Sequence, residues 1–217
     1  MKILAVEFSS EQRSVAVLQE GRALGCASET GGRTARAFTL IEKALREARL
    51  EREDIECIAV GLGPGSYAGT RAAIALAQGW QVARPIRLLG ISSVECLAAQ
   101  ARASGMSGRV NVLIDAQRNE FYFAAYEIDE RGSHMAEPLQ IVTRAAVEAR
   151  CALGETVVGP DLLGQFPKAR LLLPDAATLG GIASTQTGFV SGDKLEPIYL
   201  RQATFVKSPP PRIISNL

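Results

Sequence analysis

The sequence predicts an α/β protein made of two similar halves, because one hairpin pattern occurs twice. Apolar runs at 3–8 and 110–114 each have an acid at or next to their end, Glu7 in the first and Asp115 after the second. A polar turn and then another apolar run follow each of these runs. Short apolar runs separated by polar turns are typical of β-hairpins, and strands alternating with helices are typical of α/β folds. Two unrelated hairpins would give the same repeat, so the pattern alone leaves that alternative open.

The first half, residues 1–105, is expected to form a sheet with helices packed on it. Its strands are predicted at 3–8, 14–18, 23–29, 55–62 and 86–89, and its helices at 33–50, 69–83 and 92–103. The last of these helices has a start signal, because Ser92 followed by Glu95 is typical of a capping box. A polar, glycine-containing break at 104–108 then separates the halves.

The second half, residues 106–217, repeats the hairpin and continues less regularly. Its strands are predicted at 110–114, 121–128, 139–142 and 156–158, and its helices at 144–153 and 175–189. The chain then reaches three consecutive prolines within 208–212, a composition typical of an extended or disordered tail.

The composition is that of a folded globular protein and excludes some functional classes. Of the 217 residues, 47% are hydrophobic and 22% are charged, and the formal net charge is +1. A chain without a basic field is not expected to be drawn to nucleic acid or to an anionic membrane by charge alone. Any contact with RNA is therefore expected to be indirect or local.

Cysteine usage and hydropathy indicate a cytoplasmic protein. The cysteines, Cys26, Cys57, Cys96 and Cys151, are far apart and form no Cys-x-x-Cys pair, so they are predicted to be reduced and buried. The apolar run at the N-terminus is too short for a signal peptide, and no later run approaches membrane-spanning length.

The glycine-rich loop at 61–69 is the most distinctive local feature. Glycines after a buried strand let the backbone turn tightly and direct amides and a helix N-terminus toward an anion. The residues expected to face an anion or a nucleotide are Glu7, Gly63, Gly65, Ser66, Gly69, Arg71 and Asp115. No Lys-Ser/Thr pair closes the loop as in a Walker A motif, so a structural turn remains the alternative.

Few side chains are candidates for chemistry. Ser66 is expected to cap the following helix rather than act as a nucleophile, because Pro64 replaces the first glycine of a Gly-x-Ser-x-Gly motif. Glu7 and Asp115 could hold a hydrated magnesium ion together, or could be solvated carboxylates at strand ends. The single histidine, His134, lies in a polar segment expected to be a surface turn. No catalytic residue and no metal ligand is therefore assigned.

Two predicted helices carry more apolar surface than one sheet can cover. The helix after the glycine loop is apolar nearly all round and rich in small residues, and alanines widen the apolar stripe of the helix before it. We expect an interface with another chain at Ala37, Phe38, Ile41, Ala44, Leu45, Ala48, Ala72, Ala73, Leu76 and Trp80. The alternative is that both helices are buried between the two halves.

One segment resembles a known family signature. Residues 58–71 have the sequence Ile-Ala-Val-Gly-Leu-Gly-Pro-Gly-Ser-Tyr-Ala-Gly-Thr-Arg. This segment is similar to the signature Gly-Pro-Gly-Ser-Phe-Thr-Gly-Leu-Arg of the bacterial TsaB (YeaZ) family. That family belongs to the glycoprotease-like branch of the actin/Hsp70 (ASKHA) superfamily. Residues 3–7, 112–122 and 196–201 resemble further segments of that family in the same order. The resemblance covers most of the chain and implies a duplicated actin/Hsp70-like, RNase H-like fold.

The resemblance also implies a function. Proteins of this family support a related subunit, TsaD, which holds the catalytic metal and transfers threonylcarbamoyl to adenosine 37 of ANN-decoding tRNAs, and a TsaE ATPase binds the pair. The pairing surface is made by the first two helices, and the same surface is expected to form a homodimer when the chain is alone. No intrinsic cofactor is implied, and ATP or ADP with magnesium is expected only at the complex.

The histidine count bears on which subunit this chain resembles. TsaD-like proteins carry a His-x-x-x-His metal motif, which a chain with one histidine cannot supply. The resemblance therefore implies the non-catalytic subunit rather than the enzyme.

The first hairpin and the loop depart from the family pattern. Glu7-Phe8-Ser9 replaces the usual Asp-Thr-Ser, and Ala68 and Thr70 replace Thr and Leu. A bulky Phe8 in the turn makes nucleotide binding by the first half less expected.

Two enzymatic functions are alternatives to the non-catalytic subunit. A stand-alone ATPase or small-molecule kinase would use Glu7, Asp115 and the loop at 63–69 around magnesium and phosphate. A peptidase would need a metal cluster or an activated nucleophile, which the sequence does not show.

Overall fold

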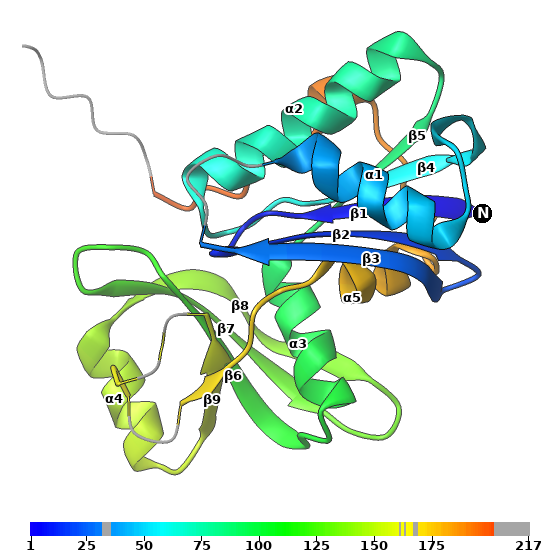
Figure 1. The fold of residues 1–217 in the computed structure, drawn as a ribbon. Coiled ribbons are helices and arrows are strands. Elements are labelled where there is room, and N and C mark those ends of the chain that lie inside the picture. The colour runs from blue at the N-terminus through cyan, green and yellow to red at the C-terminus, as the bar shows by residue number, and fades with distance from the viewer. Residues whose placement is uncertain (32–35, 161, 163, 167–168, 202–217) are drawn as a thin grey trace, which may run out of the picture.

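The computed structural model describes residues 1–31, 36–160, 162, 164–166 and 169–201, which form two five-stranded sheets with helices between and around them (Figure 1). The proline-rich tail predicted at 208–212 and the start of the helix predicted at 33 lie outside the described residues. No helix in the described part of the chain is long and apolar enough to cross a membrane.

The first sheet has the strand order β3-β2-β1-β4-β5. Its strands are β1 (Lys2–Glu7), β2 (Gln12–Gln19), β3 (Arg22–Thr30), β4 (Cys57–Gly61) and β5 (Arg87–Ile91). β1 is antiparallel to β2 and parallel to β4, so it lies at the centre of the sheet. Its side chains are buried on both faces from Ile3 to Glu7, which explains why the sequence there is apolar without alternation.

The second sheet repeats this order as β8-β7-β6-β9-β10. Its strands are β6 (Gly108–Asp115), β7 (Glu120–Ile128), β8 (Ser133–Thr143), β9 (Thr156–Gly159) and β10 (Arg170–Leu171). β6 is antiparallel to β7 and parallel to β9, as β1 is to β2 and β4. The predicted fold class, a duplicated α/β fold of two mixed sheets with flanking helices, is confirmed.

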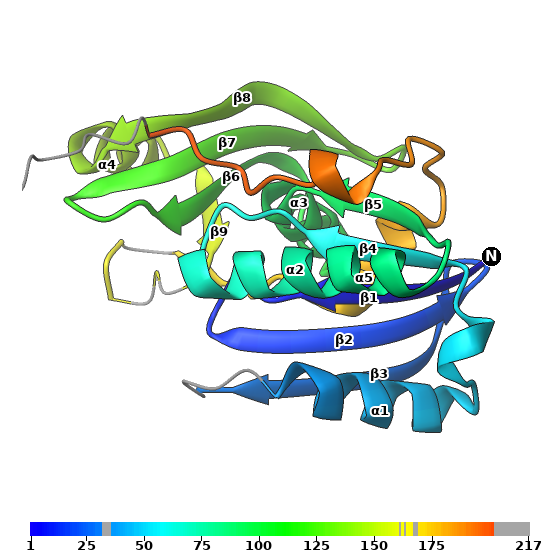
Figure 2. The same ribbon diagram turned by 90° about the horizontal axis from the view of Figure 1, so that it is seen from above.

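Helices cover both faces of the first sheet. α1 (Ala37–Ala48) and α2 (Tyr67–Ala83) lie on one face, and α3 (Ser93–Ala103) and α5 (Ala176–Ala183) lie on the other (Figure 1). Short 3₁₀ turns, η1 (Arg52–Asp54) and η2 (Gly192–Lys194), complete this half. Figure 2 shows α1 and α2 running roughly parallel over the strands, with β2 visible between them.

The two halves of the fold do not correspond to two uninterrupted halves of the sequence. The break predicted at 104–108 falls between the two sheets, but α5 comes from the second half of the sequence and packs on β1 and β2 of the first sheet. This close approach requires a glycine at position 180, because an added Cβ there would lie 2.1 Å from a methyl carbon of Leu18. α3 is shared, since Cys96 packs on the first sheet and Leu97 on the second.

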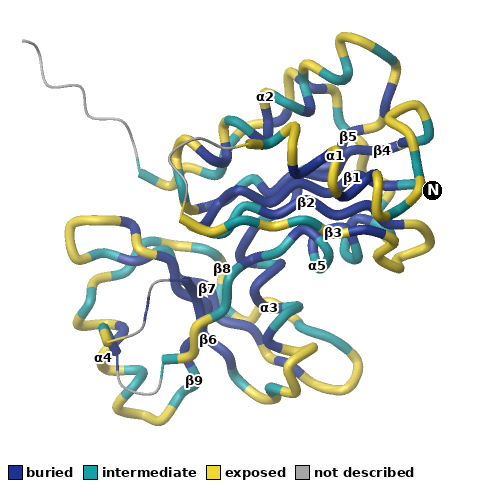
Figure 3. The backbone as a smooth tube through the Cα atoms, viewed as in Figure 1, coloured by how far each residue is buried: buried dark blue, intermediate teal, exposed yellow. Residues whose placement is uncertain are grey.

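The second sheet is covered by α3 on one face and by α4 (Arg144–Ala152) on the other. No second helix was found beside α4 among the described residues. Instead, the loop after β9 contributes Leu162 and Phe166, which are buried in the core of that face. Figure 3 shows the buried strands at the centre of each half and the exposed outer surfaces of α1, α2 and α4.

Three local predictions were wrong. The helix predicted at 175–189 ends at Ala183, and Val190 pairs instead with Leu88 of β5. His134 is not in a turn but near the start of β8, an edge strand that begins earlier than its apolar pattern suggested. Cys26 is exposed because β3 is also an edge strand, whereas Cys57 and Cys96 are buried as predicted.

Candidate functional site

A groove lies between the outward sides of α1 and α2. It has a volume of about 790 Å³ and is lined mainly by apolar side chains, among them Phe38, Ile41, Leu76 and Trp80. Phe38 is 67% exposed and borders this apolar groove rather than standing alone on the surface.

The predicted interface residues divide into two groups. Ile41, Ala44, Leu45 and Ala73 are buried in the protein's own core. Phe38 is exposed, and Ala37, Ala48, Ala72, Leu76 and Trp80 are half-buried around it. The inner side of α1 is occupied because Gly25 of β3 lets the helix backbone approach closely, with an added Cβ only 2.2 Å from the Ala44 carbonyl oxygen. The free apolar surface is therefore narrower than the sequence suggested.

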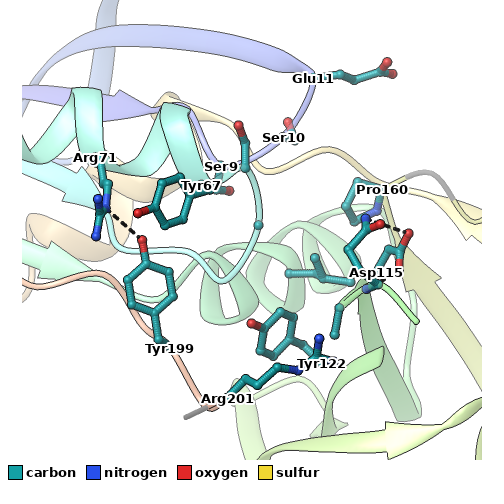
Figure 4. A pocket seen from close by; sticks show the side chains of 15 residues that line it. Ser9, Ser10, Glu11, Tyr67, Arg71, Asp115, Tyr122, Pro160, Tyr199 and Arg201 are labelled. Carbon is teal, nitrogen blue, oxygen red and sulfur yellow. Dashed lines mark hydrogen bonds between the residues drawn. The ribbon is translucent and has the colours of Figure 1, made fainter. Parts of the chain in front are cut away.

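A second hollow, the cleft, lies between the two halves and has a volume of about 750 Å³. Figure 4 shows its lining from close by. Gly65, Ser66, Arg71 and Asp115, four of the residues predicted to face an anion, line it. Glu7, Gly63 and Gly69, the other three, are not among its lining residues.

Glu7 is enclosed rather than directed into the cleft. Its Oε1 accepts a hydrogen bond of 2.7 Å from the Ser9 amide, and its Oε2 accepts one of 2.9 Å from the Ser93 hydroxyl of α3. Gly61 leaves room for the carboxyl group, since an added Cβ would lie 2.0 Å from Oε2. Burial raises the pKa of Glu7, although the hydrogen bonds from Ser9 and Ser93 oppose the rise.

Asp115 has a different environment although it also ends the first strand of its sheet. It is exposed, and its Oδ1 accepts a hydrogen bond of 2.7 Å from the Gln117 amide. It pairs with Phe121, whose ring is buried under α4, whereas Glu7 is directed toward α3. Asp115 lines the cleft, whereas Glu7 is buried and is not among the lining residues, so the two acids do not face one ion in this arrangement. No group of three or more acidic, histidine or cysteine side chains suited to a metal was found among the described residues.

The glycine loop is packed against the first hairpin. The Ser66 hydroxyl accepts a hydrogen bond of 3.3 Å from the Gly69 amide, which confirms the predicted helix cap. The Ser66 amide donates at 2.6 Å to the Ser9 carbonyl. An added Cβ on Gly65 would lie 2.1 Å from that same carbonyl oxygen, and one on Gly69 would lie 2.0 Å from the Phe8 carbonyl oxygen. These glycines therefore serve close packing, the alternative that the sequence left open.

Three aromatic and basic side chains that were not predicted as site residues line the cleft beside Arg71. They are Tyr67, Tyr199 and Arg201. The Tyr67 and Tyr199 rings are stacked with centroids 5.8 Å apart, and Arg201 forms an ion pair with Glu120 of the second half. The segment at 196–201, singled out by its resemblance to a family motif, was the signal that could have placed Tyr199 and Arg201 here.

Comparisons with known proteins agree with this architecture. The family described as "TsaD: tRNA N6-adenosine threonylcarbamoyltransferase" matches residues 34–154. The structure of YeaZ from Pseudomonas aeruginosa superposes with a TM-score of 0.77 at 31% identity, over 92% of this chain and 99% of that one. The chain belongs to the TsaB (YeaZ) family. Two TsaB proteins, named as tRNA threonylcarbamoyladenosine biosynthesis proteins, are similar to this chain over nearly their full lengths. The protein from Escherichia coli is 29% identical over 93% of this chain and 95% of the relative. The protein from Haemophilus influenzae is 27% identical over 96% of this chain and 98% of the relative.

The departures of this chain from the TsaB pattern have a structural explanation. Phe8, which replaces a threonine, is fully buried in the core under α1 and α2 and does not enter the cleft. The expectation that its bulk would hinder a ligand is therefore wrong. The exchange instead adds apolar volume beneath the two helices that border the groove.

Proposed function

We propose that this chain is the supporting, non-catalytic subunit of the machinery that attaches threonylcarbamoyl to adenosine 37 of ANN-decoding tRNAs. In this proposal it binds a TsaD-like catalytic subunit through the groove between α1 and α2, and a TsaE-like ATPase joins the pair. The single observation that carries the proposal is an apolar groove with an exposed aromatic ring, Phe38, on a chain of the TsaB family.

The groove has the features of a protein interface. Phe38 and Trp80 can supply the large aromatic contacts that dominate binding energy, and the small residues Ala75 and Gly79 let another helix approach the backbone. Arg52, Glu53 and Arg84 at one end provide a polar rim. The same groove would join two copies of the chain when the catalytic subunit is absent, which accounts for the expected homodimer.

The assignment of chemistry to the partner is also part of the proposal. Glu7 is enclosed, and the one histidine of the sequence lies on an edge strand. We therefore assign no intrinsic cofactor to this chain and place ATP or ADP with magnesium at the complex. With a net charge of +1, contact with tRNA is expected to pass through the partner. The expected cytoplasmic location belongs to this proposal as well.

The test is to mix the purified chain with its cognate TsaD-like subunit on a sizing column and to measure the affinity by calorimetry. The wild-type chain should co-elute, and Phe38→Glu should raise the Kd at least about 30-fold, because it places a charge at the centre of an apolar contact. Leu153→Glu is the matched control, since Leu153 is 79% exposed at the end of α4, far from the groove in sequence and in the fold. Failure of the wild-type chain to bind would overturn the proposal.

A further inference from the structure

The exposed side of α2 forms a continuous stripe from the groove to the cleft. Every fourth residue along the helix is exposed, namely Tyr67, Arg71, Ala75, Gly79 and Ala83. Residues four apart are neighbours on an α-helix, and a row of them is inclined to the helix axis, so these five form one winding ridge in which Arg71 adjoins Ala75. Ala75, Gly79 and Ala83 line the groove, whereas Tyr67 and Arg71 line the cleft. A partner that covers the groove therefore meets Arg71 at the end of the same surface.

Arg71 is held in a defined position by two tyrosines. Its guanidinium carbon lies 4.1 Å from the Tyr67 ring centroid and 5.8 Å from that of Tyr199. Its Nε donates a hydrogen bond of 3.1 Å to the Tyr199 hydroxyl, as Figure 4 shows. Tyr199 is itself fixed, because the preceding Ile198 amide donates to the Leu62 carbonyl at 2.9 Å. Little conformational entropy remains for Arg71 to lose on binding.

This ordered arginine has no acidic partner among the described residues. The ion pairs of the described chain involve Arg52, Arg109, Arg150, Arg201 and Lys2, but not Arg71. The hydrogen bond to Tyr199 uses Nε, and the guanidinium group forms no ion pair with a carboxylate of the described residues. A planar guanidinium group matches the geometry of a carboxylate or a phosphate.

The surroundings favour a carboxylate on a protein over a phosphate. At the start of α2, the amides of Ser66 and Gly69 already donate to Ser9 and to the Ser66 hydroxyl, so these two are not available to a phosphate. The stripe, in contrast, connects Arg71 directly to the groove. We infer that Arg71, oriented by Tyr67 and Tyr199, binds a carboxylate of the protein that occupies the groove, and so extends the interface along α2 to the mouth of the cleft. This inference rests on the proposed function.

The test compares Kd values of full-length variants for the cognate TsaD-like subunit at two salt concentrations. Arg71→Ala should raise the Kd about 30-fold at low salt, because it removes a charge-assisted pair of hydrogen bonds, and should make the affinity less sensitive to salt. Arg71→Lys keeps the charge but loses the planar group, and should fall between the wild type and Arg71→Ala.

Arg87→Ala is the matched control. Arg87 is also exposed and stacked, with its guanidinium carbon 5.2 Å from the Phe189 ring centroid, but it lies on β5 and not on the stripe. This variant should leave the Kd within about twofold of wild type, as expected for an arginine outside the interface. Equal thermal unfolding of the three variants would show that each is folded.

Two outcomes would overturn the inference while leaving the proposed function intact. The first is wild-type affinity in Arg71→Ala. The second is unchanged partner affinity combined with weaker binding of ATP or tRNA, which would show that Arg71 serves a phosphate. Failure of the wild-type chain to bind its partner at all would instead overturn the proposed function, and this inference with it.

Discussion

The two halves share one strand order but cover the corresponding face of the sheet in different ways. In the first half, the helix after the third strand, α1, has a helical neighbour, α2, and a groove lies between them. In the second half, the corresponding helix, α4, is accompanied by the loop that carries Leu162 and Phe166. Leu162 and Phe166 are buried in the core of that face, whereas the helix pair leaves Phe38 exposed beside an apolar groove. This difference supports placing the proposed partner surface in the first half.

The largest expected loss of stability comes from a change in the core between the second sheet and the loop that carries Phe166. Phe166 is 5% exposed and meets Phe121 edge to face, with ring centroids 5.1 Å apart. Phe166→Ala should lower the free energy of unfolding by about 3 to 5 kcal/mol, because it removes a buried ring and leaves a cavity. Chemical denaturation measures this. Trp80→Ala, on the half-buried rim of the groove, should cost clearly less; equal losses would mean that the two faces are covered equally well.

The next prediction concerns the enclosure of Glu7. Gly61→Ala should lower the free energy of unfolding by about 3 kcal/mol, because the new methyl group would occupy the position of the Glu7 carboxyl oxygen 2.0 Å away. Gly79→Ala is the control, since nothing lies within 4 Å of an added Cβ on that exposed side of α2. That change should stabilise the helix by about 0.5 to 1 kcal/mol. Similar values for both variants would contradict the enclosure.

The last prediction is a pH dependence of the free energy of unfolding that differs between the buried Glu7 and the exposed Asp115. Because burial raises the pKa of Glu7 above its ordinary value of 4.5, the folded chain binds the proton more tightly than the unfolded chain does. The contribution of Glu7 to stability is therefore greatest below pH 4.5 and falls as the pH rises through the raised pKa. Relative to Glu7→Gln, the wild-type chain should lose stability as the pH rises from 4.5 toward neutral.

Thermal unfolding at a series of pH values measures this difference. The same series with Asp115→Asn shows what an exposed carboxylate at the end of β6 contributes. A wild-type chain that instead gains stability over Glu7→Gln as the pH rises would mean that the hydrogen bonds from Ser9 and Ser93 outweigh burial.

The sequence predicted what local pattern can determine. The paired hairpins, the glycine loop and the cap at Ser66 all follow from short runs of residues, and they were found where expected. Long-range packing set the rest. Nothing in the composition of 176–183 shows that this helix returns to the first sheet, and Tyr199 reaches Tyr67 across 132 positions of the chain.

The candidate site shows the same limit. Apolar periodicity identified α1 and α2 as a pair with surplus surface, but it could not show which side of each helix the sheet would use. Ile41, Ala44, Leu45 and Ala73 face inward, and only the structure separates them from Phe38. Glu7 illustrates a second limit, because the side to which a strand-end side chain points depends on a register that one sequence does not reveal.

The return of α5 to the first sheet has a consequence for the order in which the protein is made. The face of that sheet formed by Ile3, Ala5 and Leu18 is completed by Leu179 and Ala183. While the ribosome is still synthesising the second half, this face has no cover from α5. The strands of the first sheet therefore reach their final packing only after α5 has been translated, and the nascent chain lacks this part of the cover on an apolar sheet face until then.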